Sequence, residues 1–389
     1  MNLKKIDIHN VASIDSLSIN FSAGMNIICG PNGIGKTTIL ECIAQCFSGQ
    51  YVNILKRRAD SDSGAVKAWI NRDDSESYSE FSVTELLPVM GKDWCSPNEE
   101  AAKNLLSFKV ARTFIHQPLN AISRDVTKDI NNIANENKNG LNIAEVKNWF
   151  INRHLFSAHA GSLTETQIHN VQVAKEFFGL LNSDYKFSRV DASSNEIMVH
   201  TPAGEILYEY LSSGFKSCLS ILFGIVKELE FRFKDSNAKA DDFRGVILID
   251  EIELHLHPDW QVKIAKILTK AFPKAQFIVS THSPHVIQAA KPNEVIALEA
   301  HDGTVFRREL PDTQYGFQGW TIEEVLRDVM GMQDTRTPAY RNTLSQFEDA
   351  VDEENYNNAK EAYEELNKLL HPENHLRKLL AFQLGALKG

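Results

Sequence analysis

The sequence has few cysteines and no long hydrophobic run, and both shortages limit the classes of protein to which it can belong. Its 389 residues include five cysteines, none of which belongs to a CxxC pair or a histidine-rich cluster. This spacing predicts neither a disulfide framework nor a structural zinc site. No stretch approaches the ~20 apolar residues of a membrane span, and residues 1–10 lack the apolar run of a signal peptide. We therefore expect a cytoplasmic protein with no membrane segment.

A surplus of basic residues is also missing. The 41 lysines and arginines stand against 51 aspartates and glutamates, which gives a formal net charge of -10. A surface that coats nucleic acid indiscriminately is therefore not expected, although oligomerisation can still assemble a local basic patch. Apolar residues make up 43% of the chain, enough to fill one large domain with insertions or two domains.

One glycine-rich segment carries the strongest chemical signal. Residues 30–37 match the pattern G-x-x-x-x-G-K-[ST] and lie between an apolar strand and a helix pattern. Such a loop turns backbone N–H groups toward phosphates, and the helix N-terminus adds a favourable dipole. We expect Lys36 to reach the β- and γ-phosphates of ATP and Thr37 to offer its hydroxyl to Mg²⁺. The predicted ATP-binding residues of this loop are Gly30, Pro31, Asn32, Gly33, Gly35, Lys36, Thr37 and Thr38.

Two apolar strands further along the chain end in polar residues that suit hydrolysis. Residues 246–249 are followed by Asp250 and Glu251, and the strand around 277–279 is followed by His282. The carboxyl ends of strands border the ligand site in an α/β sheet. We predict that Asp250 holds Mg²⁺, that Glu251 orients or deprotonates the attacking water, and that His282 contacts the γ-phosphate. The alternatives are a solvated acidic turn and a structural histidine.

A serine- and glycine-containing turn precedes a helix pattern that runs from Cys218 to Leu229. Residues 211–217 read LSSGFKS, so that Ser212 and the N–H groups near Gly214 form a helix N-terminus suited to an anion. Taken alone, this turn is equally an ordinary N-cap.

In this order, the four elements resemble those of the ABC ATPases, in the branch that includes the SMC and RecF proteins. The resemblance implies an α/β head with a mixed P-loop sheet, flanking helices and antiparallel N-terminal strands. It places residues 211–216 at the signature motif, where Ser212 and Gly214 complete the ATP site of a second protomer. Two ATP molecules would then lie at a head-to-head interface. Ser213 and Phe215 depart from the usual LSGGQ pattern.

Several further residues gain an expected role from this resemblance. Gln117, after the strand-like residues 108–115, is the candidate for the glutamine that senses Mg²⁺ and water, and an exposed loop glutamine is the alternative. Arg57 and Arg58 either approach phosphate, as in SMC heads, or form a solvated basic turn. Residues 250–258 read DEIELHLHP, which resembles RecF-like and OLD-like ATPases and not transporters.

The resemblance and the composition divide the chain into four segments. Residues 1–95 and 185–310 form the two parts of the ATPase core, and residues 96–184 form a helical insertion or lid. Residues 311–389 form a helical tail that docks a partner or supports oligomerisation, or else packs as a hairpin on its own core. No sustained heptad pattern separates the glycine-rich loop from the signature, which argues against long coiled-coil arms.

The tail carries a second resemblance. Residues 315–331 and 334–336 resemble the C-terminal segment of the stand-alone ATPases of Septu and related retron-associated anti-phage systems. That resemblance implies a homodimer or higher homo-oligomer that holds a separate HNH-type nuclease under nucleotide control, with DNA reached through the nuclease. The alternatives are a RecF-like DNA repair ATPase that binds DNA directly and a regulatory switch with almost no turnover.

Overall fold

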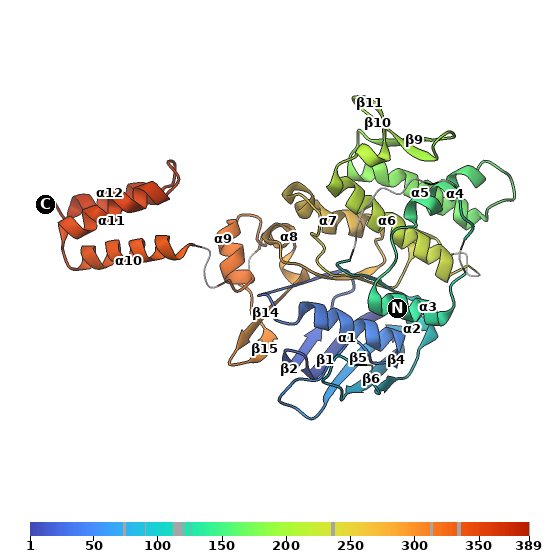
Figure 1. Cartoon of the computed structure of the whole chain (residues 1–389), viewed down its shortest axis with the longest axis horizontal. Helices are drawn as coiled ribbons and strands as arrows, with labels where there is room; N and C mark the ends of the chain where they lie inside the picture. The colour runs from blue at the N-terminus through green and yellow to red at the C-terminus, as the bar shows by residue number, and fades with distance from the viewer. Residues whose placement is uncertain are drawn as a thin grey trace. The chain divides into compact units, whose positions relative to one another are not determined.

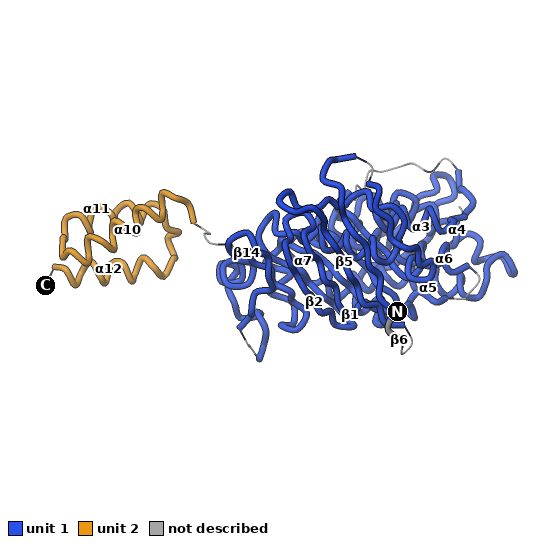
Figure 2. Tube along the Cα trace, turned by 90° about the horizontal axis from the view of Figure 1, so that it is seen from below, with its two compact units in different colours: residues 1–331 blue, residues 332–389 orange. Residues whose placement is uncertain are grey.

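The chain folds as two units, Met1–Gly331 and Met332–Gly389, which Figure 2 shows in different colours. The computed structural model describes residues 1–72, 75–89, 91–111, 119, 121–125, 127–234, 238–311, 314–332 and 336–388. The first unit contains two hydrophobic cores and the second unit contains one.

The continuous apolar runs of the sequence form the centre of a six-stranded sheet in the first unit (Figure 1). Its strands are β3 (Met25–Cys29), β8 (Leu105–Phe108), β12 (Val246–Ile249), β13 (Gln276–Ser280), β14 (Val295–His301) and β15 (Thr304–Arg307). They lie in the order β15-β14-β3-β13-β12-β8, and all pairs are parallel except β15 with β14. Strands that are covered on both faces have no polar side, which explains the unbroken apolar runs.

This sheet separates two hydrophobic cores, because successive side chains of a strand point to opposite faces. In β13, Phe277 and Val279 belong to one core and Ile278 belongs to the other. In β12, Ile249 belongs to the first of these cores and Leu248 to the second. The ends of these strands therefore lie between two packed layers, which fix their position.

An antiparallel sheet and one helix cover the first face of the central sheet (Figure 1). The antiparallel sheet has the order β2-β1-β5-β6. Its strands are β1 (Asn2–Val11), β2 (Ile14–Asn20), β5 (Gly64–Arg72) and β6 (Ser75–Val83). Helix α1 (Lys36–Ser48) contacts β1, β5 and β6 on one side and β13 on the other. The predicted antiparallel N-terminal strands are thus confirmed, and a short pair, β4 (Gln50–Tyr51) with β7 (Trp94–Cys95), follows α1.

Helices cover the opposite face. They are α4 (Val146–Phe156), α5 (Glu165–Leu181), α6 (Ser213–Arg232), α7 (Pro258–Ala271) and α8 (Pro284–Ala289). An antiparallel sheet of β9 (Lys186–Asp191), β10 (Glu196–Thr201) and β11 (Gly204–Leu207) lies beside α4 and α5. Phe223 of α6 stacks on Phe150 of α4 with ring centroids 4.8 Å apart, so aromatic packing holds α6 in this layer.

The segment expected to be a helical insertion, residues 96–184, also supplies an edge strand of the central sheet. Besides α4 and α5 it contains α2 (Glu99–Lys103), α3 (Ile130–Asn139) and β8. The sequence pattern predicts a strand from Phe108 to Ile115, whereas β8 ends at Phe108, because the buried run that starts at Leu105 pairs with β12. Residues 112–118 lie outside the described part of the chain.

The division into units falls later than the expected start of the tail at residue 311. Phe317, Val325, Val329 and Met330 join the core of the first unit, so that residues 314–331 pack with the head. They include α9 (Ile322–Glu324) and a π-helical turn, Val325–Val329. The second unit consists of α10 (Pro338–Asp352), α11 (Tyr356–Leu369) and α12 (Leu376–Ala386) around a small core. Within the described residues, no helix has the length and apolar character to cross a membrane.

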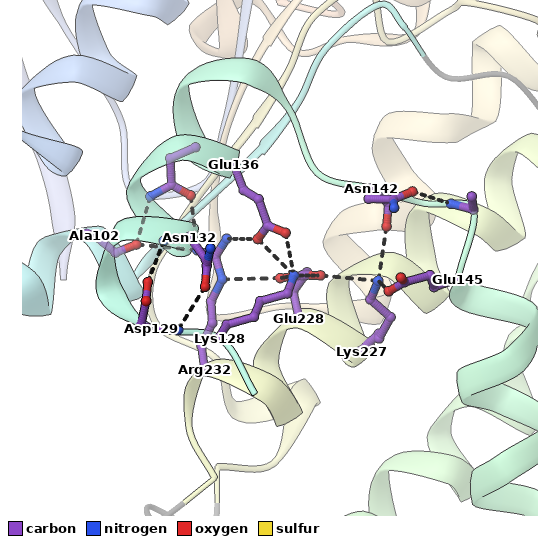
Figure 3. A network of polar contacts seen from close by, with 12 residues as sticks. Ala102, Lys128, Asp129, Asn132, Glu136, Asn142, Glu145, Lys227, Glu228 and Arg232 are labelled. Carbon is purple, nitrogen blue, oxygen red and sulfur yellow. Dashed lines mark hydrogen bonds and ion pairs between the residues drawn. The ribbon is translucent and has the colours of Figure 1, made fainter. Parts of the chain in front are cut away.

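A buried network of charges ties α6 to the insertion (Figure 3). The carboxylate of Glu228, with a side chain 1% exposed, lies 2.7 Å from Lys128 Nζ, which also contacts Glu136 of α3 at 2.7 Å. On α6 itself, Lys227 and Arg232 each approach the same carboxylate at 3.4 Å. Burial raises the pKa of Glu228, but the three surrounding cations together lower it below its usual value. The ionised form of Glu228 therefore joins α6 to the insertion.

Removing this central charge should destabilise the protein. In Glu228→Gln the three buried cations lose their shared anion, so we expect the free energy of unfolding to fall by about 3–5 kcal/mol in urea titrations. The matched control is Glu364→Gln, which removes an exposed partner of Lys360 on α11. There the change should stay below about 0.5 kcal/mol. Equal losses in the two variants would contradict a stabilising role for the buried network.

Candidate nucleotide-binding site

The predicted phosphate, metal and water-binding residues meet at one edge of the central sheet. Strands β3, β13 and β12 are neighbours and run parallel, so the segments that follow their carboxyl ends lie side by side. These segments are residues 30–35, 281–283 and 250–255. In parallel α/β sheets this edge is where ligands bind.

The glycine-rich loop is shaped by two positions that exclude a side chain. Gly30 has φ 144° and Gly35 has φ 106°, values that L residues rarely adopt. A Cβ atom on Gly30 would lie 2.5 Å from the carbonyl oxygen of Leu298, and one on Gly35 would lie 2.9 Å from Ile14 Cγ1. The backbone therefore passes close to its neighbours and curls into the N-terminus of α1.

That N-terminus suits an anion. No side chain caps α1, and no acidic residue lies in its first turn. The N–H groups of a first turn have no partner inside the helix, and the helix dipole favours negative charge there. This arrangement fits the phosphates of ATP.

Lys36 lies at the same helix start and is 4% exposed. Its ammonium donates to the carbonyl oxygens of Gly30 and Pro31, both at 2.9 Å. Burial lowers the pKa of Lys36, while the charges of the carboxylates that follow β12 act in the opposite direction. The backbone thus holds the ammonium inside the curl of the loop.

Hydroxyl and carboxylate oxygens converge beside this ammonium. Thr37 Oγ1 donates to both carboxylate oxygens of Asp250, at 3.2 and 3.1 Å. Ser280 Oγ at the end of β13 donates to Asp250 Oδ1 at 2.6 Å and accepts the N–H of Glu251 at 2.8 Å. Mg²⁺ prefers such oxygen ligands, so the donor set formed by Thr37 and Asp250 fits it. Ser280 was not predicted from the sequence, although it lies within the strand that precedes His282.

The residues predicted to act on water occupy the adjoining turns. Glu251 follows β12 with φ 49°, an unusual value for a residue with a side chain, and it is half-buried. His282 is exposed after β13. The carboxylate of Glu253 accepts from Thr281 Oγ1 at 2.7 Å and from the N–H of His282 at 2.6 Å. Glu253 is a second residue to which the sequence pattern assigned no role, although it lies within the DEIELHLHP segment.

The signature-like turn forms the N-terminus of α6. Ser212 and Ser213 are exposed, and the Ser212 side chain accepts the N–H of Phe215 at 3.3 Å. Phe215 is 2% exposed and meets the ring of Trp260 edge-on, with centroids 5.7 Å apart. A Cβ atom on Gly214 would lie 2.8 Å from Trp260 Cδ1. Packing against α7 therefore explains why an aromatic residue replaces the usual Gln or Glu of the motif.

The structure does not place every predicted residue at this edge. Gln117 lies outside the described residues. Arg57 donates to the carbonyl oxygens of Thr84, Arg58 and Ser61, so its guanidinium is hydrogen-bonded within the segment that follows β4. His257, which lies in the DEIELHLHP segment and had no predicted role in the site, caps α7, where its Nδ1 accepts the N–H of Asp259 at 3.4 Å.

Comparison with known proteins agrees with this geometry. The sequence profile of a family described as an AAA domain matches residues 5–257. The Septu protein PtuA of Bacillus thuringiensis is 43% identical over 394 residues, which cover 98% of this chain and 98% of that protein. This chain belongs to the PtuA family of ABC-type ATPases.

Two further comparisons are more distant. The probable ATPase of retron Ec83 from Escherichia coli is 30% identical over 146 residues, which cover 38% of this PtuA-family chain and 26% of that protein. Among solved structures, the SMC head domain from Thermotoga maritima has a TM-score of 0.46 at 16% identity and covers 80% of this chain and 100% of its own.

A substitution at Asp250 tests whether this carboxylate holds a metal ion. In the native protein, Asp250 would hold the ion, whose positive charge would favour the phosphates, so removal of Mg²⁺ with EDTA should weaken ATP binding at least about tenfold, or about 1.4 kcal/mol. In Asp250→Asn, EDTA should change the ATP affinity less than about twofold. Calorimetric titration measures both, with the exposed Asp302→Asn as the control. An unchanged Mg²⁺ effect in Asp250→Asn would remove Asp250 from the metal site.

Proposed function

We propose that this ATPase hydrolyses ATP with Mg²⁺ between two head-to-head protomers. The observation that carries the proposal is the junction at Asp250, where side chains from the glycine-rich loop and from β13 meet one carboxylate. Lys36 and the N-terminus of α1 bind the phosphates. Thr37 and Asp250 would hold the metal ion, which would supply positive charge for phosphoryl transfer.

The chain's own residues then act on the attacking water. Glu251 follows the junction directly, and the bond of its N–H to Ser280 fixes its backbone against β13. Its carboxylate orients the water and takes its proton, which is the positioning task that phosphoryl transfer leaves to the protein. His282, in the turn after the same strand, contacts the γ-phosphate.

The signature turn supports the two-protomer arrangement. Ser212 and Ser213 are exposed at the start of a 20-residue helix that has no acidic residue in its first turn. By contrast with the exposed serines, the hydroxyl of Thr37 donates to Asp250 within its own chain. In the proposed dimer, Ser212 and the N–H of Gly214 contact the γ-phosphate that the second protomer binds.

The family supports a biological role in anti-phage defence. We infer that the ATPase holds a separate HNH-type nuclease under nucleotide control and reaches DNA through that nuclease. The second unit is the proposed docking or oligomerisation element, because Leu379 and Phe382 of α12 are 54% and 77% exposed. A RecF-like repair ATPase that binds DNA directly is the alternative role.

A mixture of two inactive variants tests the shared sites. Lys36→Ala removes the phosphate ligand from a protomer's own site, and Ser212→Arg blocks the site of its partner. Each variant alone should lack turnover. An equal mixture should recover up to about a quarter of the native rate, because half of the random dimers keep one of two sites. Native turnover in either single variant, or no recovery on mixing, would contradict the composite site.

Affinity purification tests the partner. Tagged Glu251→Gln should keep ATP bound, so it is purified with ATP from cells that carry the neighbouring genes, and Lys36→Ala serves as the control without nucleotide. We expect a small nuclease in fixed ratio with the first variant, identified by mass spectrometry. Recovery of DNA without a protein partner would favour the repair role instead.

A further inference from the structure

The carboxylate of Glu253 bridges the two turns that carry Glu251 and His282. Glu253 lies two residues after Glu251 in the turn that follows β12. Its Oε1 accepts the N–H of His282 at 2.6 Å, and its Oε2 accepts the hydroxyl of Thr281 at 2.7 Å. Both oxygens therefore bind the turn that follows β13, although 28 positions of sequence separate Glu253 from Thr281.

The turn that Glu253 binds is also fixed from other sides. Thr281 is fully buried, and its N–H donates to the carbonyl oxygen of Ile28 at 3.0 Å. Its Oγ1 accepts the N–H of Ser283 at 3.0 Å, while Ser283 Oγ donates to Gln261 of α7 at 2.5 Å. The backbone around His282 is therefore held on each side of that residue, while the imidazole is exposed.

We propose that Glu253 is a positioning residue for hydrolysis, which sets the place of His282 relative to Glu251. This inference rests on the proposed roles of those two residues. The turn after β12 carries Glu251 and Glu253 together, so any shift of the His282 turn away from Glu253 also shifts it away from Glu251. A displacement of about 1 Å in a reacting group is enough to slow an enzyme by orders of magnitude.

The chemistry of the contact favours a carboxylate over an amide. Ionised Glu253 offers only acceptors, and its two oxygens meet two donors. A glutamine would turn an amide N–H toward one of these donors. If the hydroxyl of Thr281 accepted this N–H in addition to that of Ser283, its own hydrogen would lose the carboxylate as a partner in a fully buried position. Because both oxygens accept hydrogen bonds from the turn after β13, the role that we assign to Glu253 is to act through His282.

A double-mutant cycle tests this role. Glu253→Gln, His282→Ala and the double variant are compared by kcat for ATP and by the Kd for ATP. We expect Glu253→Gln to lower kcat about 10- to 100-fold, the worth of a hydrogen bond to a charged group, and to change Kd less than about threefold, because the phosphate ligands are intact. The double variant should have the kcat of His282→Ala alone, because Glu253 has nothing left to position.

A second pair of variants distinguishes the loss of this hydrogen bond from a folding defect. Thr281→Val removes the hydroxyl that donates to Glu253 and accepts from Ser283, while nearly keeping the side-chain volume, and should lower kcat in the same direction as Glu253→Gln. Thr281→Ser restores the donor and should recover at least half of the native kcat. Equal loss in the Val and Ser variants would show that the packing of Thr281 matters and not its bond to Glu253, which would overturn the proposal.

The cycle separates two kinds of failure. If His282→Ala keeps native turnover, the proposed role of His282 is wrong, and the role of Glu253 falls with it. If His282→Ala is slow and the effects of the two substitutions multiply in the double variant, His282 keeps its role and only the proposal for Glu253 is overturned.

Discussion

The carboxylate of Asp250 is the point at which the nucleotide edge of the sheet is held together. It accepts hydrogen bonds from the hydroxyl of Thr37 at the start of α1 and from the hydroxyl of Ser280 at the end of β13. Ser280 in turn accepts a hydrogen bond from the N–H of Glu251. Three segments that are far apart in the sequence thus converge within hydrogen-bond distance. The proposed phosphate, metal and water sites all depend on this junction.

The two hydrophobic cores keep that junction in place. Because the central strands are covered on both faces, their carboxyl ends cannot move without disturbing a packed layer on either side. The signature helix α6 belongs to the opposite layer from α1. Its N-terminus packs against Trp260, and its C-terminal part is tied to the insertion through the ion cluster around Glu228. Because an unpaired buried charge is costly, the position of α6 in which Glu228 meets its cations is favoured over others.

The sequence predicts the parts of the site that are local. The loop around Lys36 and the apolar strand before Asp250 are continuous segments, so their shape follows from glycine placement and from the length of each apolar run. The parallel α/β arrangement and the helical C-terminal unit follow in the same way, and both are confirmed. The pattern also predicts a signature-like turn at residues 211–216, but the reason for Phe215 needed the neighbouring Trp260.

The parts that the sequence could not predict depend on contacts between distant segments. Nothing near Glu253 indicates that its carboxylate meets Thr281, and Ser280 reads only as the last residue of a strand. The extent of β8 is set by its pairing with β12, which no local pattern reveals. Residues 314–331 resemble the start of a helical tail, yet Phe317 and its apolar neighbours pack into the core of the head.

The most direct measurement is an experimental structure of Glu251→Gln crystallised with ATP and Mg²⁺. We predict a dimer in which the γ-phosphate lies between Lys36 of one protomer and Ser212 of the other, with the metal ion bound to the Thr37 hydroxyl. A nucleotide bound by one protomer alone, with Ser212 facing solvent, would contradict the composite site.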